Sequence, residues 1–267
     1  MSSLTRVVGD SLVITKRNLI KVKRVPDLIV FATLSPIMFV LLFVYVFGSA
    51  IPIEGIGYAE FMVPGIFAQT VIFGSTITGA SLADDLQKGL VERFRSLPMA
   101  RSAVVIGRTV ADQGLNVITI IVMSLTGLLV GWRIRSSVLD ALAGFALLLV
   151  FGFAISWMFA LVGLLVRTPE VVNNAGFIVI FPLTFIANTF VPTNDFPTVL
   201  RVFADWNPVS AVTQASRELF GNTTPALPVP DAWSLQHPVL YTFLWAGLIL
   251  AIFVPLSIRQ YVRAAGR

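Results

Sequence analysis

The sequence predicts an all-α integral membrane protein with six transmembrane helices, and three observations lead to that fold class. Of the 267 residues, 56% are hydrophobic and only 12% are charged, and the mean hydropathy is +0.86. Soluble domains are about 45–50% apolar and about 25% charged, so a soluble fold of this size could not bury so much apolar surface. The apolar residues also gather into runs of roughly 20, the length that crosses a bilayer. The third observation is that the basic residues collect between alternate runs.

Residues 1–27 precede the first apolar run and predict an amphipathic helix on the membrane surface. Its apolar stripe comprises Leu4, Val7, Val8, Leu12, Leu19 and Val22. The opposite face carries the charged residues Arg6, Asp10, Arg17, Lys21 and Arg24. A basic amphipathic helix that leads into a span suits the inner membrane interface, where its basic side chains meet anionic head groups. We therefore expect membrane lipids to be direct partners of this segment.

Six apolar segments follow, and each is long enough to cross a bilayer. Helices rise about 1.5 Å per residue, so about 20 residues cover the roughly 30 Å of hydrocarbon. The second and fifth segments are interrupted by Gly, Thr, Asn and Pro, whereas the first, fourth and sixth are more uniformly apolar. The predicted spans are residues 28–48, 61–83, 110–131, 138–166, 171–191 and 239–258. They make a single transmembrane domain of the whole chain, residues 1–267.

The distribution of basic residues predicts the orientation of these spans. Of the 19 Lys and Arg residues, 15 fall on the side that holds the two termini and the loop after the second span, and four fall on the opposite side. Loops rich in Lys and Arg stay in the cytoplasm. We therefore expect a multi-pass protein of the cytoplasmic membrane with both termini in the cytoplasm.

Residues 84–101, between the second and third spans, predict a second amphipathic helix on the cytoplasmic side. Its apolar ridge comprises Leu86, Leu90, Phe94 and Leu97. Lys88 and Glu92 form an i,i+4 pair on the polar face, and Pro98 ends the helix. Acidic and basic residues are mixed on that face, and anionic lipid does not favour the acidic ones. A mixed-charge face beside an apolar ridge indicates a surface that docks a protein.

The loop after the fifth predicted span, residues 192–222, predicts two short helices on the outer side. Pro192 breaks the span, and the Asn207-Pro208 pair marks a turn between the two helices. Each helix has one apolar face but is too short to cross the bilayer. We expect both to re-enter the outer leaflet, packed against the rest of the protein.

Residues that would support catalysis are missing. The sequence has no Cys and a single histidine, His237, so neither a thiolate nor a pair of His ligands can form a metal site. No Gly precedes a Lys, which rules out a phosphate-binding P-loop. Asp112 lies one turn after Arg108 near the cytoplasmic end of the third span, where a local ion pair at the interface is a simpler interpretation than a proton relay. We expect no catalytic residue, no metal site, no cofactor bound to this chain and no nucleic-acid partner.

Several motifs, taken in this order, resemble the permeases of type-2 ABC exporters. They are the amphipathic helix between the second and third spans that ends in Leu-Pro, and the FVPTNDFP and NPVSAVTQASREL stretches after the fifth span. The chain is most similar to the daunorubicin-resistance type of drug and lipid exporter, and the resemblance covers nearly the whole sequence. Relatives commonly have an E-R-G-T-L-E-like sequence in the helix, of which this chain retains Gly89, Glu92 and the following Leu-Pro.

The resemblance implies that this chain is half of a transporter. Two such permeases, identical or paralogous, would pair in the membrane, and two separate ATPase subunits that bind ATP and Mg would dock beneath them. The helix within residues 84–101 would be the coupling helix, which inserts into the ATPase surface. The coupling residues implied are Leu86, Gly89, Leu90, Glu92, Arg93, Phe94, Leu97 and Pro98.

The resemblance also implies that the second and fifth spans of the two permeases line a hydrophobic substrate cavity. Phe177, Phe181 and Phe185 recur every fourth residue in the fifth span, and Phe67 and Phe73 in the second span are placed to face them. Ordinary helix packing or contact with lipid explains the same pattern equally well.

Together these features predict a non-enzymatic permease subunit of an ATP-driven exporter, which moves an amphiphilic drug, antibiotic or lipid outward across the cytoplasmic membrane. Two alternatives stay open. One is the permease of an exporter for lipid-linked polysaccharides or glycolipids, which shares the fold. The other is an ATP-independent membrane scaffold or enzyme. The lack of catalytic clusters counts against an enzyme, and the mixed-charge helix counts against a free-standing membrane protein.

Overall fold

The computed structural model describes residues 3–24, 26–90, 99–166, 168–194, 196–226 and 231–264, and every regular element within these ranges is a helix. The helices are α1 (Ser3–Arg24), α2 (Pro26–Leu42), the π-helix η1 (Phe43–Phe47), α3 (Tyr58–Gly74), α4 (Thr76–Gln87), α6 (Ser102–Leu129), α7 (Val138–Leu165), α8 (Pro169–Phe185), α9 (Thr198–Trp206), α10 (Pro208–Phe220), α11 (Trp233–Gln236) and α12 (Pro238–Ala264). The all-α fold class is therefore confirmed for the described part of the chain.

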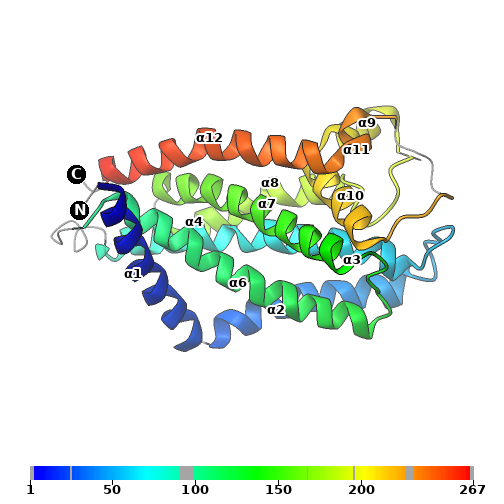
Figure 1. Ribbon diagram of the computed structural model, residues 1–267, viewed down its shortest axis with the longest axis horizontal. Helices are drawn as coiled ribbons and strands as arrows, with labels where there is room; N and C mark the ends of the chain where they lie inside the picture. Colours follow the sequence, from blue (N-terminus) through cyan, green and yellow to red (C-terminus); the bar gives the residue numbers. More distant parts are fainter. Residues whose placement is uncertain are drawn as a thin grey trace.

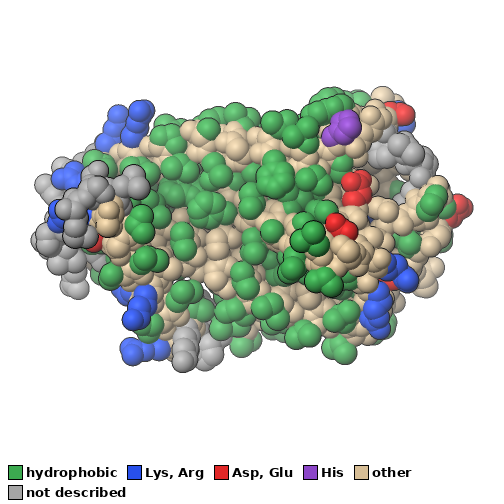
Figure 2. Space-filling view, in the orientation of Figure 1, with side chains coloured by type: hydrophobic (Ala, Val, Ile, Leu, Met, Phe, Trp, Pro, Cys, Tyr) green, Lys and Arg blue, Asp and Glu red, His purple; other side chains and the backbone are tan. Residues whose placement is uncertain are grey.

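The long helices run side by side along the longest axis of the molecule (Figure 1). The start of α1 and the end of α12 lie at one end, whereas the short helices α9, α10 and α11 gather at the other. Hydrophobic side chains cover the middle of the face shown in Figure 2, and most charged side chains lie near its two ends. An apolar belt between two charged ends is the surface that a bilayer requires.

Among the residues that the structure describes, four helices are long and apolar enough to cross a membrane. They are Tyr58–Gln87, which joins α3 and α4, then Ser102–Leu129, Val138–Leu165 and Pro238–Arg263. These correspond to the second, third, fourth and sixth predicted spans. The first and fifth predicted spans correspond to the shorter apolar helices Ala32–Phe47 and Pro169–Phe185. The structure therefore shows a multi-span helical protein with four full-length candidate spans and two shorter apolar helices.

Proline and capping side chains determine where several helices begin. Pro169, Pro208 and Pro238 each occupy the first turn of a helix, where the missing N–H is not needed. The side chain of Asn207 accepts a hydrogen bond from Val209 N at 2.9 Å and so caps α10. The two short helices predicted after the fifth span are therefore present as α9 and α10, joined at the predicted Asn-Pro turn.

Helix α3 lies at the centre of the bundle, and almost all of its residues are buried. It contacts α6, α7 and α10, and its continuation α4 packs against α7 and α8. Phe67 at its middle is fully buried, with its ring 5.2 Å from Trp132, 5.9 Å from Phe145 and 5.9 Å from Phe220. The second predicted span is thus the core of the protein, even though Gly, Thr and Pro interrupt its apolar sequence.

Helices α4 and α7 touch through their backbones. A Cβ added at Gly163 would lie 2.1 Å from Gly79 O, and one added at Gly79 would lie 2.4 Å from Phe159 O. No other residue fits at either position without moving the partner helix. Small residues that let two backbones approach this closely are typical of helix pairs within membranes.

Helix α1 packs on α6 mainly through residues outside its predicted apolar stripe. The buried side chains of α1 are Ser11, Ile14, Thr15 and Asn18. Thr15 Oγ1 donates a hydrogen bond to Gly107 O at 3.2 Å. Val8 is 52% exposed, and Leu12 and Leu19 are exposed as well, so the stripe lies free for contact with lipid. Helix α1 is thus amphipathic, as predicted. Its main contact with the protein is made by a different face, which comprises Ser11, Ile14, Thr15 and Asn18.

The prediction of one continuous helix over residues 84–101 is wrong at its start. Helix α4 carries on to Gln87, and Gly89 adopts a left-handed conformation with φ of 65°, which ends the helix. Lys88 pairs with Asp84 at 2.7 Å, and this hydrogen bond raises the pKa of Lys88. Leu86 therefore belongs to α4, and Leu90 comes after the turn.

The remaining predicted coupling residues lie outside the described residues of the structure. They are Glu92, Arg93, Phe94, Leu97 and Pro98. Their predicted helix and their apolar ridge therefore stay predictions.

Candidate functional site

A groove of about 340 Å³ lies among α2, α3, α4, α6 and α8, at the middle of the long helices. Its volume is within the range of about 300–1,000 Å³ that is usual for small-molecule sites. The residues that line it are Ala32, Ser35, Pro36, Phe39, Ile66, Gln69, Thr70, Phe73, Gly74, Thr76, Ile77, Leu115, Asn116, Thr119, Phe177 and Phe181. It is the strongest candidate for a functional site because it combines an apolar wall with a few polar groups.

One wall of the groove is aromatic. Phe73 of α3 and Phe177 of α8 have ring centroids 6.4 Å apart, and Phe177 stacks on Phe181 at 5.0 Å. Phe181 in turn stacks on Phe185 at 4.1 Å. Phe177 is 55% exposed and Phe181 36% exposed, so both rings present area that another molecule can cover. The structure thus brings together four of the five phenylalanines predicted for the cavity.

The same ladder of rings continues toward the end of the molecule that holds α9. Phe185 lies 4.8 Å from Phe190, and Phe190 stacks on Phe43 of η1 at 4.3 Å. Phe43 then stacks on Phe47 at 5.1 Å. A run of aromatic faces therefore connects the groove with the start of the loop that follows η1.

Phe67 does not belong to this groove, and its predicted place opposite the fifth span is wrong. Its ring is enclosed by the aromatic residues of α7, α10 and the α6–α7 connection that were described above. The helical period explains the error: Phe67 and Phe73 are six residues apart, about 240° around a helix, and so point to different neighbours.

The floor of the groove is polar but uncharged. Gln69 and Thr70 of α3 and Asn116 and Thr119 of α6 are all buried. Thr119 donates to Leu115 O of its own helix at 2.9 Å. The amide nitrogen of Asn116, in contrast, has no hydrogen-bond partner among the described residues. A buried amide without a partner is rare, because its desolvation is not repaid.

Gly74 makes room for the Asn116 amide. A Cβ added at Gly74 would lie 2.4 Å from Asn116 Oδ1, so any other residue there would push the amide away. The glycine on α3 and the asparagine on α6 therefore fit together at the edge of the groove.

Arg108 and Asp112 form the predicted ion pair, and the pair is buried within the protein. Arg108 Nε lies 3.1 Å from Asp112 Oδ2, and both residues are buried. Thr78 donates to the same carboxylate oxygen at 2.7 Å, and Arg108 Nη2 donates to Ser81 Oγ. The pair thus faces α4 inside the protein, because hydroxyl groups on α4 supply the hydrogen bonds that water would give at the surface.

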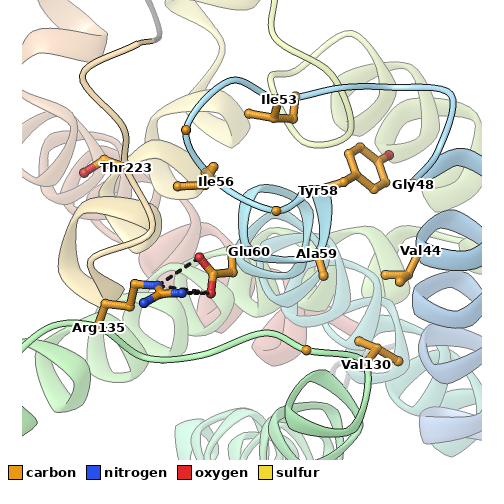
Figure 3. Close-up of a pocket in the computed structure, with 13 residues that line it drawn as sticks. Val44, Gly48, Ile53, Ile56, Tyr58, Ala59, Glu60, Val130, Arg135 and Thr223 are labelled. Atoms are coloured by element: carbon orange, nitrogen blue, oxygen red, sulfur yellow. Dashed lines mark hydrogen bonds and ion pairs between the residues drawn. The ribbon is translucent and has the colours of Figure 1, made fainter.

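A second, open pocket of about 990 Å³ lies between the η1–α3 loop and the α6–α7 loop, near the end of the molecule that holds α9, α10 and α11 (Figure 3). Figure 3 shows Glu60 and Arg135 pointing at each other across it. Arg135 Nη2 lies 2.8 Å from Glu60 Oε1, and its Nε also contacts the carboxylate, at 3.0 and 3.1 Å. The hydrogen bond and the attraction of Glu60 raise the pKa of Arg135. This ion pair ties the loop before α7 to the first turn of α3.

Arg217 of α10 is a buried clamp that the sequence did not reveal. It is 2% exposed and donates to three backbone carbonyls: Phe61 O at 2.7 Å, Asn188 O at 2.5 Å and Thr189 O at 3.2 Å. Its guanidinium also lies 3.7 Å from the ring centroid of Phe61. Arg217 therefore joins α10 to α3 and to the segment after α8. The one signal for it in the sequence was its place near the end of the NPVSAVTQASREL stretch.

Comparison with known proteins gives consistent results. The profile of the ABC-2 type transporter family matches residues 11–220. The chain is 34% identical over 245 residues to the daunorubicin resistance ABC transporter permease protein DrrB1 of Streptomyces coeruleorubidus, which covers 92% of this chain and 83% of the relative. It is 28% identical over 260 residues to the probable doxorubicin resistance ABC transporter permease protein DrrC of Mycobacterium tuberculosis, covering 97% and 90% of the two chains. A putative transport permease of Cyanophora paradoxa, ycf38, is 24% identical over 224 residues, 81% of this chain and 76% of the relative.

Proposed function

The chain belongs to the ABC-2 type transporter family, and from that premise we propose that it is the permease subunit of an ATP-driven exporter of amphiphilic small molecules. Its substrate would be a drug, an antibiotic or a lipid that moves outward across the cytoplasmic membrane. The names of two similar permeases refer to resistance against daunorubicin and doxorubicin, which supports a drug of this amphiphilic kind.

The groove is the observation that carries this proposal. An amphiphile needs both apolar surface to cover its hydrocarbon part and a few polar groups to hold its head. The aromatic wall of Phe73, Phe177 and Phe181 supplies the first, and the polar floor with Gln69 and Asn116 supplies the second. A groove of about 340 Å³ suits a molecule of a few fused rings, which favours this function over the export of a long sugar chain.

The energy would come from two separate ATPase subunits, which bind ATP and Mg and dock on the cytoplasmic side at residues 84–101. A contact within this chain supports a joint role of α1 and that segment: Ala100 N donates to Asp10 Oδ2 of α1 at 2.8 Å. Both therefore meet at the end of the molecule where the basic residues are concentrated. A force on residues 84–101 would reach α1 directly.

We further propose that the shorter helices Ala32–Phe47 and Pro169–Phe185 complete a six-span topology with both termini in the cytoplasm. At about 1.5 Å per residue, 17 residues of α8 cover about 26 Å, slightly less than the hydrocarbon core. The segment after α8 is held against α10 by Arg217, so protein satisfies its backbone at membrane depth. A second permease, identical or paralogous, would cover the exposed apolar residues that face away from lipid.

Reconstitution tests the proposed function. The chain is co-purified with the ATP-binding cassette ATPase of the same organism, placed in proteoliposomes, and assayed for ATP-dependent uptake of daunorubicin into inside-out vesicles. We expect uptake with the intact ATPase and none with a variant ATPase that binds but does not hydrolyse ATP. Uptake that is independent of ATP, or ATP hydrolysis by the purified chain alone, would contradict the proposal.

Phe181→Ala tests whether the groove takes part in transport. The ring contributes stacking of about 0.5–1.5 kcal/mol, so its loss lowers the uptake rate or the apparent affinity by about threefold or more. Phe243→Ala is the matched control, because Phe243 is similarly exposed but lies on α12, away from the groove. Equal transport by the two variants would remove the groove from the transport path.

A further inference from the structure

The groove contains two side-chain amides and no charge. All the described residues that line it are uncharged, and Gln69 of α3 and Asn116 of α6 are its two amides. An amide both donates and accepts hydrogen bonds and keeps this capacity at any pH. The groove is therefore equipped to bind neutral polar groups, and it offers no counter-ion to a charged one.

Of the two amides that line the groove, Asn116 has a buried nitrogen without a hydrogen-bond partner among the described residues. It is 4% exposed, and its Nδ2 has no partner in the described chain, although the residue lines the groove. The oxygen and nitrogen of an amide exchange places by a half turn of χ2, so either atom can be turned to a ligand. A buried amide that lacks a partner within its own chain gains the full benefit of a hydrogen bond when a ligand provides one.

The aromatic wall restricts the shape of that ligand. The rings of Phe177 and Phe181 are stacked with an interplanar angle of 29°, and both are partly exposed. Flat ring systems cover such a surface with offset-stacked or edge-to-face contacts. The amides on α3 and α6 lie among the same lining residues, so one molecule can contact the wall and the floor together.

A charged ring system would find no partner here. The nearest described charges on α6, Arg108 and Asp112, already pair with each other at 3.1 Å. Moving an ion from water into an apolar groove without a counter-ion is strongly unfavourable. Cation–π attraction to the aromatic rings would offset part of this desolvation cost for a cationic ligand. A comparison of neutral with cationic ligands shows whether the desolvation cost or the cation–π attraction is larger.

We propose that Gln69 and Asn116 are the specificity-determining residues of this groove, where they hydrogen-bond the carbonyl or hydroxyl groups of an uncharged, planar ring system that stacks on Phe177 and Phe181. The inference rests on the proposed function, since it assumes that the groove is where the exported molecule binds. It adds to that function a statement of which polar groups and which charge state the groove selects in the exported molecule.

The test compares three flat fluorescent probes by binding to the purified full chain in lipid nanodiscs, with empty nanodiscs as the background. Quinizarin is neutral and carries carbonyl and hydroxyl groups, anthracene is neutral without polar groups, and methylacridinium is cationic. We expect the affinity for quinizarin to exceed that for anthracene by about fivefold or more, since one or two hydrogen bonds contribute about 0.5–1.5 kcal/mol each. Methylacridinium binds more weakly than quinizarin.

Three variants assign the preference to the amides. Asn116→Leu keeps the number and branching of the side-chain heavy atoms and reduces the advantage of quinizarin over anthracene to less than about twofold. Gln69→Leu tests the amide of α3 independently. Gln113→Leu is the matched control: it removes an amide from α6 outside the groove lining, and the preference stays. Thermal melting of each variant in nanodiscs shows which of them are folded, and either of the two groove variants is sufficient for the test.

The outcomes separate this inference from the function on which it rests. If the wild-type chain binds quinizarin and anthracene equally, or if both groove variants keep the preference, the amide assignment is wrong while an exporter groove stands. If methylacridinium binds best, the aromatic wall selects cations and the neutrality of the ligand is overturned. If no probe binds although daunorubicin is transported with ATP, the export function stands and the groove is not its binding site, which overturns the inference.

Discussion

Two arginines of the described chain are buried, and each compensates for its lost water in a different way. Arg108 pairs with Asp112 and reaches a hydroxyl group on α4. Arg217 has no carboxylate within the described contacts and instead donates to three backbone carbonyls from two segments. Phe61 O belongs to the first turn of α3, and the other two carbonyls belong to the chain after the end of α8, where backbone oxygens lack helical partners. Arg217 therefore stabilises the start of α3 and the chain after α8 through hydrogen bonds, and not through an ion pair.

Removing this clamp should destabilise the protein. Arg217→Met keeps most of the side-chain volume but removes the arginine's hydrogen bonds to the carbonyls of Phe61, Asn188 and Thr189. We expect a loss of about 2–4 kcal/mol, which lowers the melting temperature by roughly 5–10 °C for a domain of this size. Melting of the purified protein in detergent, followed by tryptophan fluorescence, measures the change.

Two further variants complete that experiment. Arg217→Lys retains a donor but not the planar fork, so its melting temperature should lie between those of the wild type and the Met variant. Arg201→Met removes an exposed arginine from α9 and should change the melting temperature by less than about 2 °C. An Arg217→Met protein as stable as the wild type would show that the carbonyls find other donors.

Sequence spacing explains which of these contacts were predictable. Arg108 and Asp112 are four residues apart, and a helix places such residues side by side. Arg135 and Glu60 are separated by 75 residues and Arg217 and Phe61 by 156, so only the folded chain brings them together. The missing hydrogen-bond partner of the Asn116 amide is likewise a property of the folded chain, in which this amide packs against Gly74.

At the scale of elements, the contact between α1 and α6 depends on glycine. A Cβ added at Gly107 would lie 2.7 Å from Ser11 O and 2.7 Å from Ile14 Cβ, and one at Gly114 would lie 2.8 Å from Leu19 Cδ2. The backbone of α1 thus lies directly on α6 at Gly107, and the Leu19 side chain packs on Gly114 two turns further along α6. Its exposed apolar residues remain on another face, which leaves α1 between the protein and the lipid.

Gly107→Ala should detach α1. The added methyl group collides with backbone and Cβ atoms, which cannot rotate away, so α1 must shift or separate from α6. We expect the initial rate of tryptic cleavage at Arg17 to rise about fivefold or more in nanodiscs, because cleavage follows the population of the open state. The rate is measured by mass spectrometry of the released peptides.

Gly9→Ala provides the control on the same helix. A Cβ at Gly9 has no neighbour within 4 Å, and alanine favours a helix over glycine by about 1 kcal/mol. Cleavage at Arg17 should therefore stay the same or become slower. Similar acceleration in both variants would mean that cleavage reports fraying of α1 and not its contact with α6.

Element types were largely predictable here, whereas element ends were not. The long apolar runs predicted the positions of the main helices, since few other structures hide so many consecutive apolar residues in lipid. The apolar ridge from Leu86 to Leu90 assumed an unbroken helix, yet Gly89 permits the positive φ that ends α4. The fifth predicted span extended to residue 191, but α8 ends at Phe185 and the chain turns to meet Arg217. The ends of α4 and α8 are determined by a backbone conformation and by side-chain contacts, neither of which can be inferred from hydropathy.

At the scale of the whole molecule, the two ends differ in amino-acid composition and in the side of the membrane on which we expect them. The end that holds α1 and the end of α12 carries most of the basic residues, as the positive-inside rule requires of a cytoplasmic end. The opposite end holds α9, α10 and α11, with the ion pair of Glu60 and Arg135 nearby. If the ATPase binds only at the end that holds α1, reversing a charge at that end should weaken ATPase binding, whereas reversing a charge at the opposite end should not.

Charge reversal tests this polarity. Glu92→Arg or Arg93→Glu should reduce co-purification of the ATPase to a small fraction of the wild-type amount, since like charges then oppose each other across the docking surface. The amount of the permease in the membrane fraction should not change. Quantitative gel analysis after affinity purification of the permease gives both values.

Arg133→Glu is the control at the other end of the molecule. Arg133 hydrogen-bonds to Leu128 O and Trp132 O on the α6–α7 connection, and its substitution should leave the ATPase bound. Loss of the ATPase in this variant as well, or undiminished binding in the variants of residues 92 and 93, would contradict the proposed docking side.

The continuity of α3 and α4 has a mechanical consequence. Together they form a helix of 30 residues, Tyr58–Gln87, which at about 1.5 Å per residue is about 45 Å long. One end is gripped by Arg135 and Arg217, and the other runs into the turn at Gly89. At Gly79 and Gly163 the backbones of α4 and α7 lie in direct contact. If the ATPase docks at residues 84–101 as proposed, a force on the turn at Gly89 would pass along this helix, beside the groove, to the residues that Arg135 and Arg217 hold.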